Sequence, residues 1–159
     1  RVVVTGADSE HFLNYVMTND VSILSSDGAQ YSVMCTQTGG IVDDFVVYRL
    51  ETEKFLVVFN ASNREKDYNW FTKNAKGFNV RIEDVSDNVA MFAVQGPNAE
   101  KTLQKTSSED LSEIGRFKCA HSRVADVDVF LSRTGYTGED GFEAICRGVN
   151  RRVIAWKMP

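Results

Sequence analysis

The sequence contains few of the residues that build disulfide frameworks or metal centres. Its three cysteines, Cys35, Cys119 and Cys146, lie far apart and form no Cys-x-x-Cys pair. This odd number and wide spacing exclude a disulfide framework and a zinc cluster, and they favour a reducing compartment. The two histidines, His11 and His121, are isolated in the sequence, so we predict no metal site.

The chain also lacks a long apolar segment and an excess of basic charge. No apolar run approaches the ~20 residues that a membrane-spanning helix needs. With 18 Lys and Arg against 22 Asp and Glu, the formal net charge is −4, which argues against nonspecific binding to nucleic acid or to anionic membranes. The composition is instead that of a folded protein, and 159 residues fit one domain, or one and part of a second.

What the sequence does contain is a series of short apolar strands separated by helices and polar turns. The predicted strands cover about residues 2–4, 31–36, 41–50, 55–59, 78–82, 89–94, 117–122, 127–132 and 142–146. The predicted helices cover about residues 8–17 and 60–75, with shorter ones from about 97, over 107–114 and from about 149. Asn60 or Asn63 is the expected cap of the second helix. This order indicates an α+β fold with a mostly antiparallel sheet and helices on one face, and no internal repeat stands out.

Both ends of the sequence suggest an internal piece of a longer protein. The chain begins at Arg1 without a methionine, already inside a strand-like run, and stops at Pro159 just after an amphipathic turn. We therefore predict a nearly complete α+β domain over residues 1–100. Residues 101–159 would form part of a second, incomplete domain.

Two adjacent carboxylates interrupt the strand predicted in "TGGIVDDFVVYRL" (residues 38–50). Because side chains alternate along a strand, Asp44 shares one face with Val46 and Tyr48, and Asp43 lies on the other. If the Asp44 face is buried, a lone carboxylate there costs on the order of several kcal/mol unless it is paired. Asp44 is then either satisfied by backbone groups of the preceding turn or placed there for a ligand, and the residues alone leave both readings open. Asp43 is expected to be a solvated charge.

A second unusual segment, "SRTGYTGEDGFEAIC" (residues 132–146), has a glycine at every third position from Gly135 to Gly141. The spacing is not G-x-G-x-x-G, and a strand follows in place of a helix, so a phosphate-binding loop is not predicted. The glycines either supply the conformations of a long hairpin loop or leave the backbone bare for a flat ligand, with Tyr136 and Glu143 as contacts. The pattern alone favours the loop.

Four motifs together resemble one known family. "GGIVDDFVVY", "FNASNREKDYNW", "AVQGP" and "RTGYTGEDGFE", in this order and spacing, are similar to the aminomethyltransferase (T-protein) family of the glycine cleavage system. The similarity runs from residue 1 to about 157, and the last motif is the most specific. Related folate-binding modules, such as those of sarcosine and dimethylglycine dehydrogenases, usually differ at this glycine loop.

This resemblance implies a tetrahydrofolate-dependent transferase of glycine catabolism and one-carbon metabolism. Such an enzyme takes the aminomethyl group from the lipoyl arm of the H-protein, releases ammonia and forms methylenetetrahydrofolate. It also implies the truncated folate-binding aminomethyltransferase fold, with the folate-binding domain in residues 1–100, and a cytoplasmic location, or the mitochondrial matrix in a eukaryote.

The resemblance also implies the site residues. Asp44 would be the catalytic carboxylate beside the reactive amines of tetrahydrofolate. Glu143 would hold the amino-pyrimidine edge of the pterin through two hydrogen bonds, which suits an acceptor with two oxygens. The other residues that match folate-pocket positions of the family are Tyr31, Tyr48, Asn60 and Tyr136.

The chain departs from the family in four ways that predict an incomplete site. The family's opening segment, its later arginine-bearing segment and its C-terminal barrel are absent, and Arg116 and Phe117 stand where relatives often carry a tyrosine pair. We therefore expect these residues alone to be inactive. Two other functions stay open: a folate-dependent demethylase or the folate domain of an amine dehydrogenase, and a non-catalytic binding module. A flavin domain elsewhere in the full gene would indicate the dehydrogenase.

Overall fold

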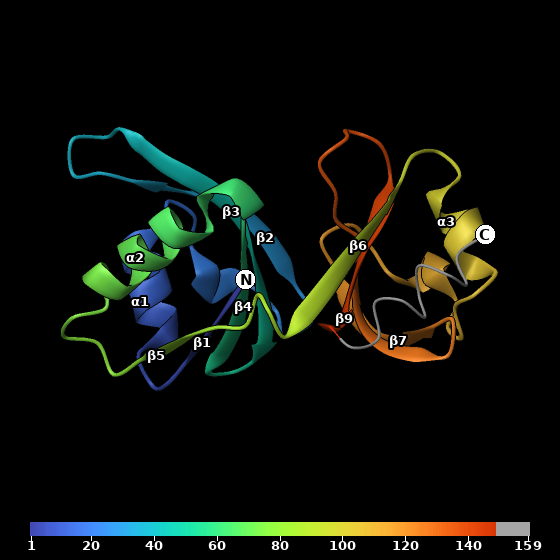
Figure 1. Cartoon of the computed structure of the whole chain (residues 1–159), viewed down its shortest axis with the longest axis horizontal. Coiled ribbons are helices and arrows are strands. Elements are labelled where there is room, and N and C mark those ends of the chain that lie inside the picture. Colours follow the sequence, from blue (N-terminus) through green and yellow to red (C-terminus); the bar gives the residue numbers. More distant parts are fainter. Residues whose placement is uncertain (149–159) are drawn as a thin grey trace. The chain divides into compact units, whose positions relative to one another are not determined.

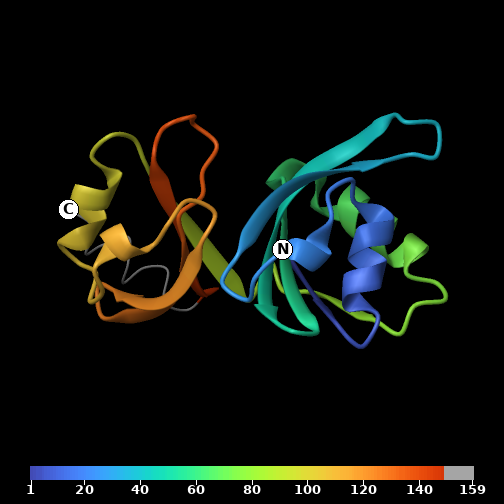
Figure 2. The same ribbon diagram turned by 180° about the vertical axis from the view of Figure 1, so that it is seen from behind.

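The computed structural model describes residues 1–148 and divides the chain into two compact units, one over Arg1–Val85 and one that begins at Ser86. Each unit is built on an antiparallel β-sheet, shown in Figure 1 and from behind in Figure 2. The helix expected from about residue 149 lies outside the described residues. No helix within residues 1–148 is long and apolar enough to cross a membrane.

The first unit is a five-stranded sheet covered by two helices. The strands, in spatial order, are β2 (Ala29–Cys35), β3 (Ile41–Glu51), β4 (Lys54–Phe59), β1 (Val2–Thr5) and β5 (Arg81–Asp84). The helices are α1 (Ser9–Val16) and α2 (Arg64–Asn74), and two 3₁₀ turns, η1 (Val21–Ile23) and η2 (Ala61–Asn63), complete the unit. Both α-helices lie side by side on one face of the sheet in Figures 1 and 2, as predicted.

The core of this unit fills the space between the helices and the sheet. Phe71 of α2 packs edge to face on Phe12 of α1 and on Phe45 of β3, with ring centroids 5.5 and 5.8 Å away. Such pairs add about 0.5–1.5 kcal/mol each to the gain from burying the rings. The core-facing side of β3 is thus the side of Phe45 and Val47, both of which are buried.

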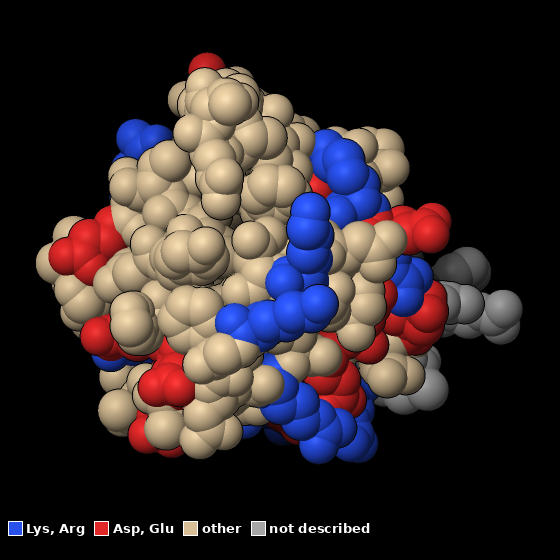
Figure 3. All heavy atoms as spheres, turned by 90° about the vertical axis from the view of Figure 1, so that its left-hand side faces the viewer, with Lys and Arg blue, Asp and Glu red and all other residues tan. Residues whose placement is uncertain are grey.

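The outer surface of the helical side carries charges of both signs (Figure 3). One ion pair ties α2 to the edge of the sheet, because Arg64 Nε lies 2.8 Å from Asp84 Oδ2. Lys66 and Lys73 of the same helix are exposed. Most residues of α2 are polar, yet the helix packs on the sheet, because Phe71 and its neighbours form one apolar stripe.

The second unit repeats the topology of the first with one strand fewer in the described residues. Its elements are β6 (Val89–Gln95), α3 (Ala99–Gln104), the 3₁₀ turn η3 (Leu111–Glu113), β7 (Cys119–Val124), β8 (Val127–Ser132) and β9 (Gly141–Arg147). The sheet order β7-β8-β9-β6 matches β2-β3-β4-β1. Gly6 and Gly96 end the first strand of each unit with positive φ, and Asp20 and Asp110 cap the 3₁₀ turn of each with a side-chain oxygen. This internal repeat was not predicted from the sequence.

The boundary between the units also differs from the prediction. β6 pairs with β9 along its whole length, from Val89↔Arg147 to Gln95↔Gly141. Residues 86–100 therefore belong to the second compact unit, although the predicted domain boundary followed residue 100. The apolar pattern of β6 identifies a strand but does not say which sheet it joins.

The predicted caps of α2 have a different role in the structure. Neither Asn60 nor Asn63 makes a capping hydrogen bond with its side chain. Both side chains instead donate hydrogen bonds to Asp43 on the neighbouring strand β3. The polar residues at the start of this helix thus serve the strand beside it, which leads to the candidate site.

Candidate functional site

The two adjacent aspartates of β3 lie in different environments on opposite faces of the sheet. Asp43 is 8% exposed and shares the core face with Phe45 and Val47, whereas Asp44 is half-buried on the other face. The expectation that Asp43 is a solvated charge is therefore wrong. The reason is that α1 and α2 cover its face of the sheet and not the face of Asp44.

Asp44 is held by two neutral donors. The Tyr31 hydroxyl of β2 donates to Oδ2 at 2.6 Å, and Asn60 Nδ2, which follows β4, donates to Oδ1 at 2.7 Å. The hydrogen bond to Asp44, followed by burial and by the charges of both aspartates, raises the pKa of the Tyr31 hydroxyl. Tyr31 therefore remains a donor, and three of the predicted site residues meet near the start of β3. Tyr48, four residues further on the same face, is fully buried.

Asp43 is the centre of a second set of hydrogen bonds. Its Oδ1 accepts from the backbone N–H of Asp44 at 2.9 Å and from Asn60 Nδ2 at 3.0 Å. Its Oδ2 accepts from Asn63 Nδ2 at 2.6 Å, and Lys66 Nζ lies 3.4 Å from the same oxygen. Asn60 therefore connects the buried aspartate to the half-exposed one.

These contacts decide the ionisation of Asp43. Burial acts to raise the pKa of Asp43, but hydrogen bonds from Asp67, the Asp44 N–H, Asn60 and Asn63 outweigh it and hold the pKa well below the usual aspartate value. Asp43 is thus a buried carboxylate whose charge is stabilised by donors.

A third carboxyl group, Asp67 of α2, lies against this cluster and was missed from the sequence. Its side chain is 0% exposed. Burial, followed by the hydrogen bond and the negative charge of Asp43, raises the pKa of Asp67 to about 7. A usable signal was present, because Asp67 stands four residues before Phe71 and so lies on the inward stripe of a helix.

The other two predicted residues belong to the second unit. Glu143 of β9 is 5% exposed and accepts a hydrogen bond from the Thr134 hydroxyl, which also lies 3.0 Å from Ser132 Oγ. Tyr136, in the loop between β8 and β9, is 80% exposed. The second unit therefore presents one fixed carboxylate and one open aromatic side chain.

The glycines of the β8–β9 loop have geometric roles. A Cβ atom on Gly135 would lie 1.8 Å from Gln95 Oε1, and one on Gly141 would lie 2.5 Å from Gln95 Cδ. The Gln95 amide donates to the carbonyl of Thr134 at 3.2 Å, and Gly138 has a φ of +81°. Two glycines thus admit the glutamine of the "AVQGP" motif and the third forms a turn, which favours the loop interpretation of the glycine spacing over a bare surface for a ligand.

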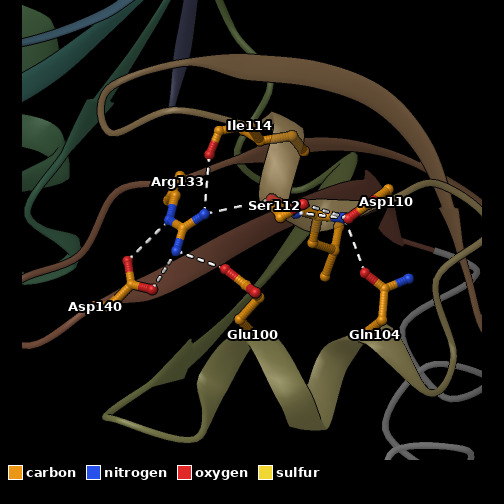
Figure 4. Close-up of polar contacts among 8 residues, drawn as sticks. Glu100, Gln104, Asp110, Ser112, Ile114, Arg133 and Asp140 are labelled. Atoms are coloured by element: carbon orange, nitrogen blue, oxygen red, sulfur yellow. Dashed lines mark hydrogen bonds and ion pairs between the residues drawn. The ribbon is translucent and has the colours of Figure 1, made fainter.

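Arg133 ties this loop to the helical side of the second unit (Figure 4). Its guanidinium donates to both carboxylate oxygens of Asp140 at 2.9 and 2.6 Å and to Glu100 of α3 at 2.7 Å. It also donates to the backbone carbonyls of Leu111 and Ile114. The hydrogen bonds with Asp140 raise the pKa of Arg133 and lower that of Asp140, so both groups stay charged and the loop is fixed at its base.

Comparison with known proteins relates the whole chain to one family. The family described as the GCVT N-terminal domain matches residues 1–157. The aminomethyltransferase of Thermosipho melanesiensis is 44% identical over 157 residues, and that of Bacillus cytotoxicus is 51% identical over 159 residues. Each match covers 99% of this chain and 43% of the relative. The chain therefore spans less than half the length of these curated relatives.

Two solved structures share the fold. The glycine cleavage system aminomethyltransferase T from Bartonella henselae matches with a TM-score of 0.87 and 29% identity, over 99% of this chain and 42% of that one. The heterotetrameric sarcosine oxidase from Corynebacterium sp. U-96 matches with a TM-score of 0.68 and 17% identity, over 98% of this chain and 74% of that one. The second likeness shows the fold alone. Together they confirm the predicted fold class, an α+β protein with antiparallel sheets.

Proposed function

Because the chain belongs to the GCVT N-terminal domain family, we propose that it forms the catalytic, folate-binding part of an aminomethyltransferase of the glycine cleavage system. The proposed reaction takes the aminomethyl group from the lipoyl arm of the H-protein, releases ammonia and yields methylenetetrahydrofolate. One observation supports the assignment of this chemistry to Asp44. Asp44 is a half-buried carboxylate held in one orientation by Tyr31 and Asn60.

The environment of Asp44 fits a ligand that carries N–H groups. A carboxylate oxygen can accept about two hydrogen bonds, and Oδ1 takes one from Asn60 while Oδ2 takes one from Tyr31. Acceptor capacity therefore remains on both oxygens. Tetrahydrofolate, when bound, supplies the amines that receive the one-carbon unit, and Asp44 is the residue that would hold them.

Asp44 can perform three tasks from this position. It orients an amine by accepting its N–H, it stabilises positive charge that develops beside it, and it accepts a proton. General acid–base help of this kind is worth roughly 10²–10⁴ in rate. Tyr31 and Asn60 fix the plane of the carboxylate, and correct positioning of a reacting group can contribute as much or more.

The remaining predicted residues complete the proposal. We assign Glu143 to the amino-pyrimidine edge of the pterin, since a buried carboxylate already held by Thr134 is preorganised to accept further N–H donors. Tyr136 and Tyr48 are assigned to the folate pocket, and the lipoylated H-protein is the proposed partner. The fold shared with sarcosine oxidase, at 17% identity, does not favour the demethylase or dehydrogenase alternative.

The experiment is a comparison of Asp44→Asn with wild type in the whole protein. With H-protein and tetrahydrofolate supplied, turnover should fall roughly 10²-fold or more, because the charge and the proton acceptor are lost. Folate affinity should change less, because the effect belongs mainly to the transition state. Asp128→Asn, whose side chain is 94% exposed, is the control for loss of one carboxylate. Unchanged turnover of Asp44→Asn at equal folded fraction would refute the role of Asp44.

A further inference from the structure

The core side of β3 contains a buried carboxyl group that the proposed reaction does not use directly. Asp67 is 0% exposed, and within residues 1–148 no N–H or O–H group of another residue donates a hydrogen bond to either of its oxygens. Lys66 Nζ, the nearby cation, lies 3.6 Å from Asp67 Oδ1 and donates instead to the Val42 carbonyl at 2.7 Å. The same ammonium lies 3.4 Å from Asp43 Oδ2, so the two buried acids face one cation. A hydrogen bond between them is among the causes that raise the pKa of Asp67 and lower that of Asp43.

We propose that Asp67 carries a proton which it donates to Asp43, and that this buried acid pair positions Asn60 and Asp44 for catalysis. The inference rests on the proposed function, and it makes Asp43 and Asp67 positioning residues because neither is placed against a reacting atom.

A hydrogen bond between the two acids requires a proton. Two ionised carboxylates are both acceptors only, so they repel each other, and a hydrogen bond between them forms only when one is protonated. Asp43 already has N–H donors from Asn60, Asn63 and the Asp44 backbone, whereas Asp67 has none. The proton therefore resides on Asp67, and the negative charge resides on Asp43.

The pair reaches the proposed site through a single side chain. Asn60 Nδ2 lies 3.0 Å from Asp43 Oδ1 and 2.7 Å from Asp44 Oδ1. The backbone N–H of Asp44 also donates to Asp43 Oδ1, at 2.9 Å. Any displacement of the Asp43 carboxylate thus moves the Asn60 amide, which holds Asp44 Oδ1, and the backbone N–H of Asp44. Loss of the Asp67 proton would produce such a displacement through repulsion between the acids.

The charged groups that face the pair are few. Lys66 of α2 approaches both acids, at 3.4 Å from Asp43 and 3.6 Å from Asp67. Asp44 of β3 is linked through Asn60, and Tyr31 of β2 is linked through Asp44. Lys66 partly offsets the negative charge but also binds the Val42 carbonyl, so it does not replace the proton.

Two variants of the whole protein separate the proton from the shape of the side chain. Asp67→Asn retains a permanent donor toward Asp43, and Asp67→Leu has a similar shape without a donor. We expect Asp67→Asn to keep turnover within about threefold at pH 6 and to lose less turnover than wild type between pH 6 and 8. Asp67→Leu should lower kcat roughly 10- to 100-fold, the scale of a displaced catalytic group, with a smaller change in the folate KM. Glu65→Gln, exposed on the same helix, is the control and should match wild type.

A second measurement tests the pair without the reaction. In ¹³C NMR of aspartate carboxyl groups, wild type should show one resonance that titrates near the Asp67 pKa of about 7, and Asp67→Asn should lack it. Absence of any such resonance from wild type would overturn the proposal that Asp67 carries a proton. If the resonance is present but Asp67→Leu turns over like wild type, the positioning role is wrong. If wild type itself transfers no aminomethyl group, the proposed function fails and the positioning role with it, while the titration still decides whether the pair exists.

Discussion

Replacement of Asp67 by asparagine should remove a large pH dependence from the stability of the first unit. The pKa of Asp67 is about 7 in the folded protein, against 3.8 for a free aspartate side chain. The folded state binds this proton more tightly than the unfolded state, so the stability it contributes is complete below pH 3.8 and is lost as the pH rises through 7. A shift of about three units corresponds to about 4 kcal/mol, and the part lost between pH 5 and pH 8 is about 3 kcal/mol.

The assay is urea unfolding of the whole protein at pH 5 and pH 8. Wild type should lose about 2–3 kcal/mol more free energy of unfolding between the two pH values than Asp67→Asn does, because the amide does not ionise. Asp43 does not obscure the comparison. Its pKa is lowered in the folded state, so it is ionised in both states above about pH 5 and its contribution appears only in more acidic solution.

The control for this measurement is Glu65→Gln, which removes one exposed carboxylate from the same helix. It should show the pH dependence of wild type. Parallel stability curves for wild type and Asp67→Asn would show that Asp67 is ionised in the folded protein at pH 5, and the reasoning would be refuted.

Three further predictions concern the second unit. Glu143→Gln should weaken folate binding by about 2–5 kcal/mol, because a donor replaces an acceptor opposite ligand N–H groups; a folate titration equal to that of wild type, or of the exposed-site control Glu139→Gln, would remove Glu143 from the site. Arg133→Lys should lower the free energy of unfolding by about 2–3 kcal/mol, because one ammonium cannot replace the bonds to Asp140, Glu100 and two carbonyls. The control is Arg123→Lys, at a side chain that is 58% exposed, and it should change the free energy of urea unfolding by less than about 0.5 kcal/mol. Equal effects of the two substitutions would contradict the role of Arg133. Gly135→Ala should cost about 1–3 kcal/mol in the same assay by displacing Gln95, whereas Gly115→Ala, where a Cβ would meet only Lys118 Cγ at 3.6 Å, should be nearly neutral.

Most strands and helices followed from the sequence, although β5 (Arg81–Asp84) begins three residues later than predicted and the helix expected over 107–114 is only the 3₁₀ turn η3 (Leu111–Glu113). The buried face of β3 did not follow. Alternation places Val46 and Tyr48 on one face and Phe45 and Val47 on the other, and both faces are apolar. The choice between them depends on α1 and α2, which pack on the side of Phe45. That contact joins residues far apart in the chain, so local periodicity cannot supply it.

The candidate site was predictable only in part, because some of its residues depend on contacts between distant elements. Tyr31, Asp44 and Asn60 were named from the family resemblance, and the structure joins them by hydrogen bonds. Asp43 and Asp67 were missed because a charged residue in a strand or helix is normally solvated. Only the stripe that Asp67 shares with Phe71 indicates otherwise, and the partner that makes its burial tolerable lies on another element.

The negative charges of the adjacent aspartates of β3 are compensated on one face of the sheet and not on the other. On the core side, Asp43 is negative, Lys66 is positive and protonated Asp67 is neutral, so this cluster carries no net charge. Asp44 lies outside this cluster, on the other face, and its charge is not compensated there, because its two donors, Tyr31 and Asn60, are neutral. Ionisation of Asp67 would add a second uncompensated charge in the core, where the local dielectric is low and repulsion is strong. The proton on Asp67 therefore has two effects: it makes the burial of Asp43 tolerable, and it leaves Asp44 as the uncompensated charge beside the proposed ligand site.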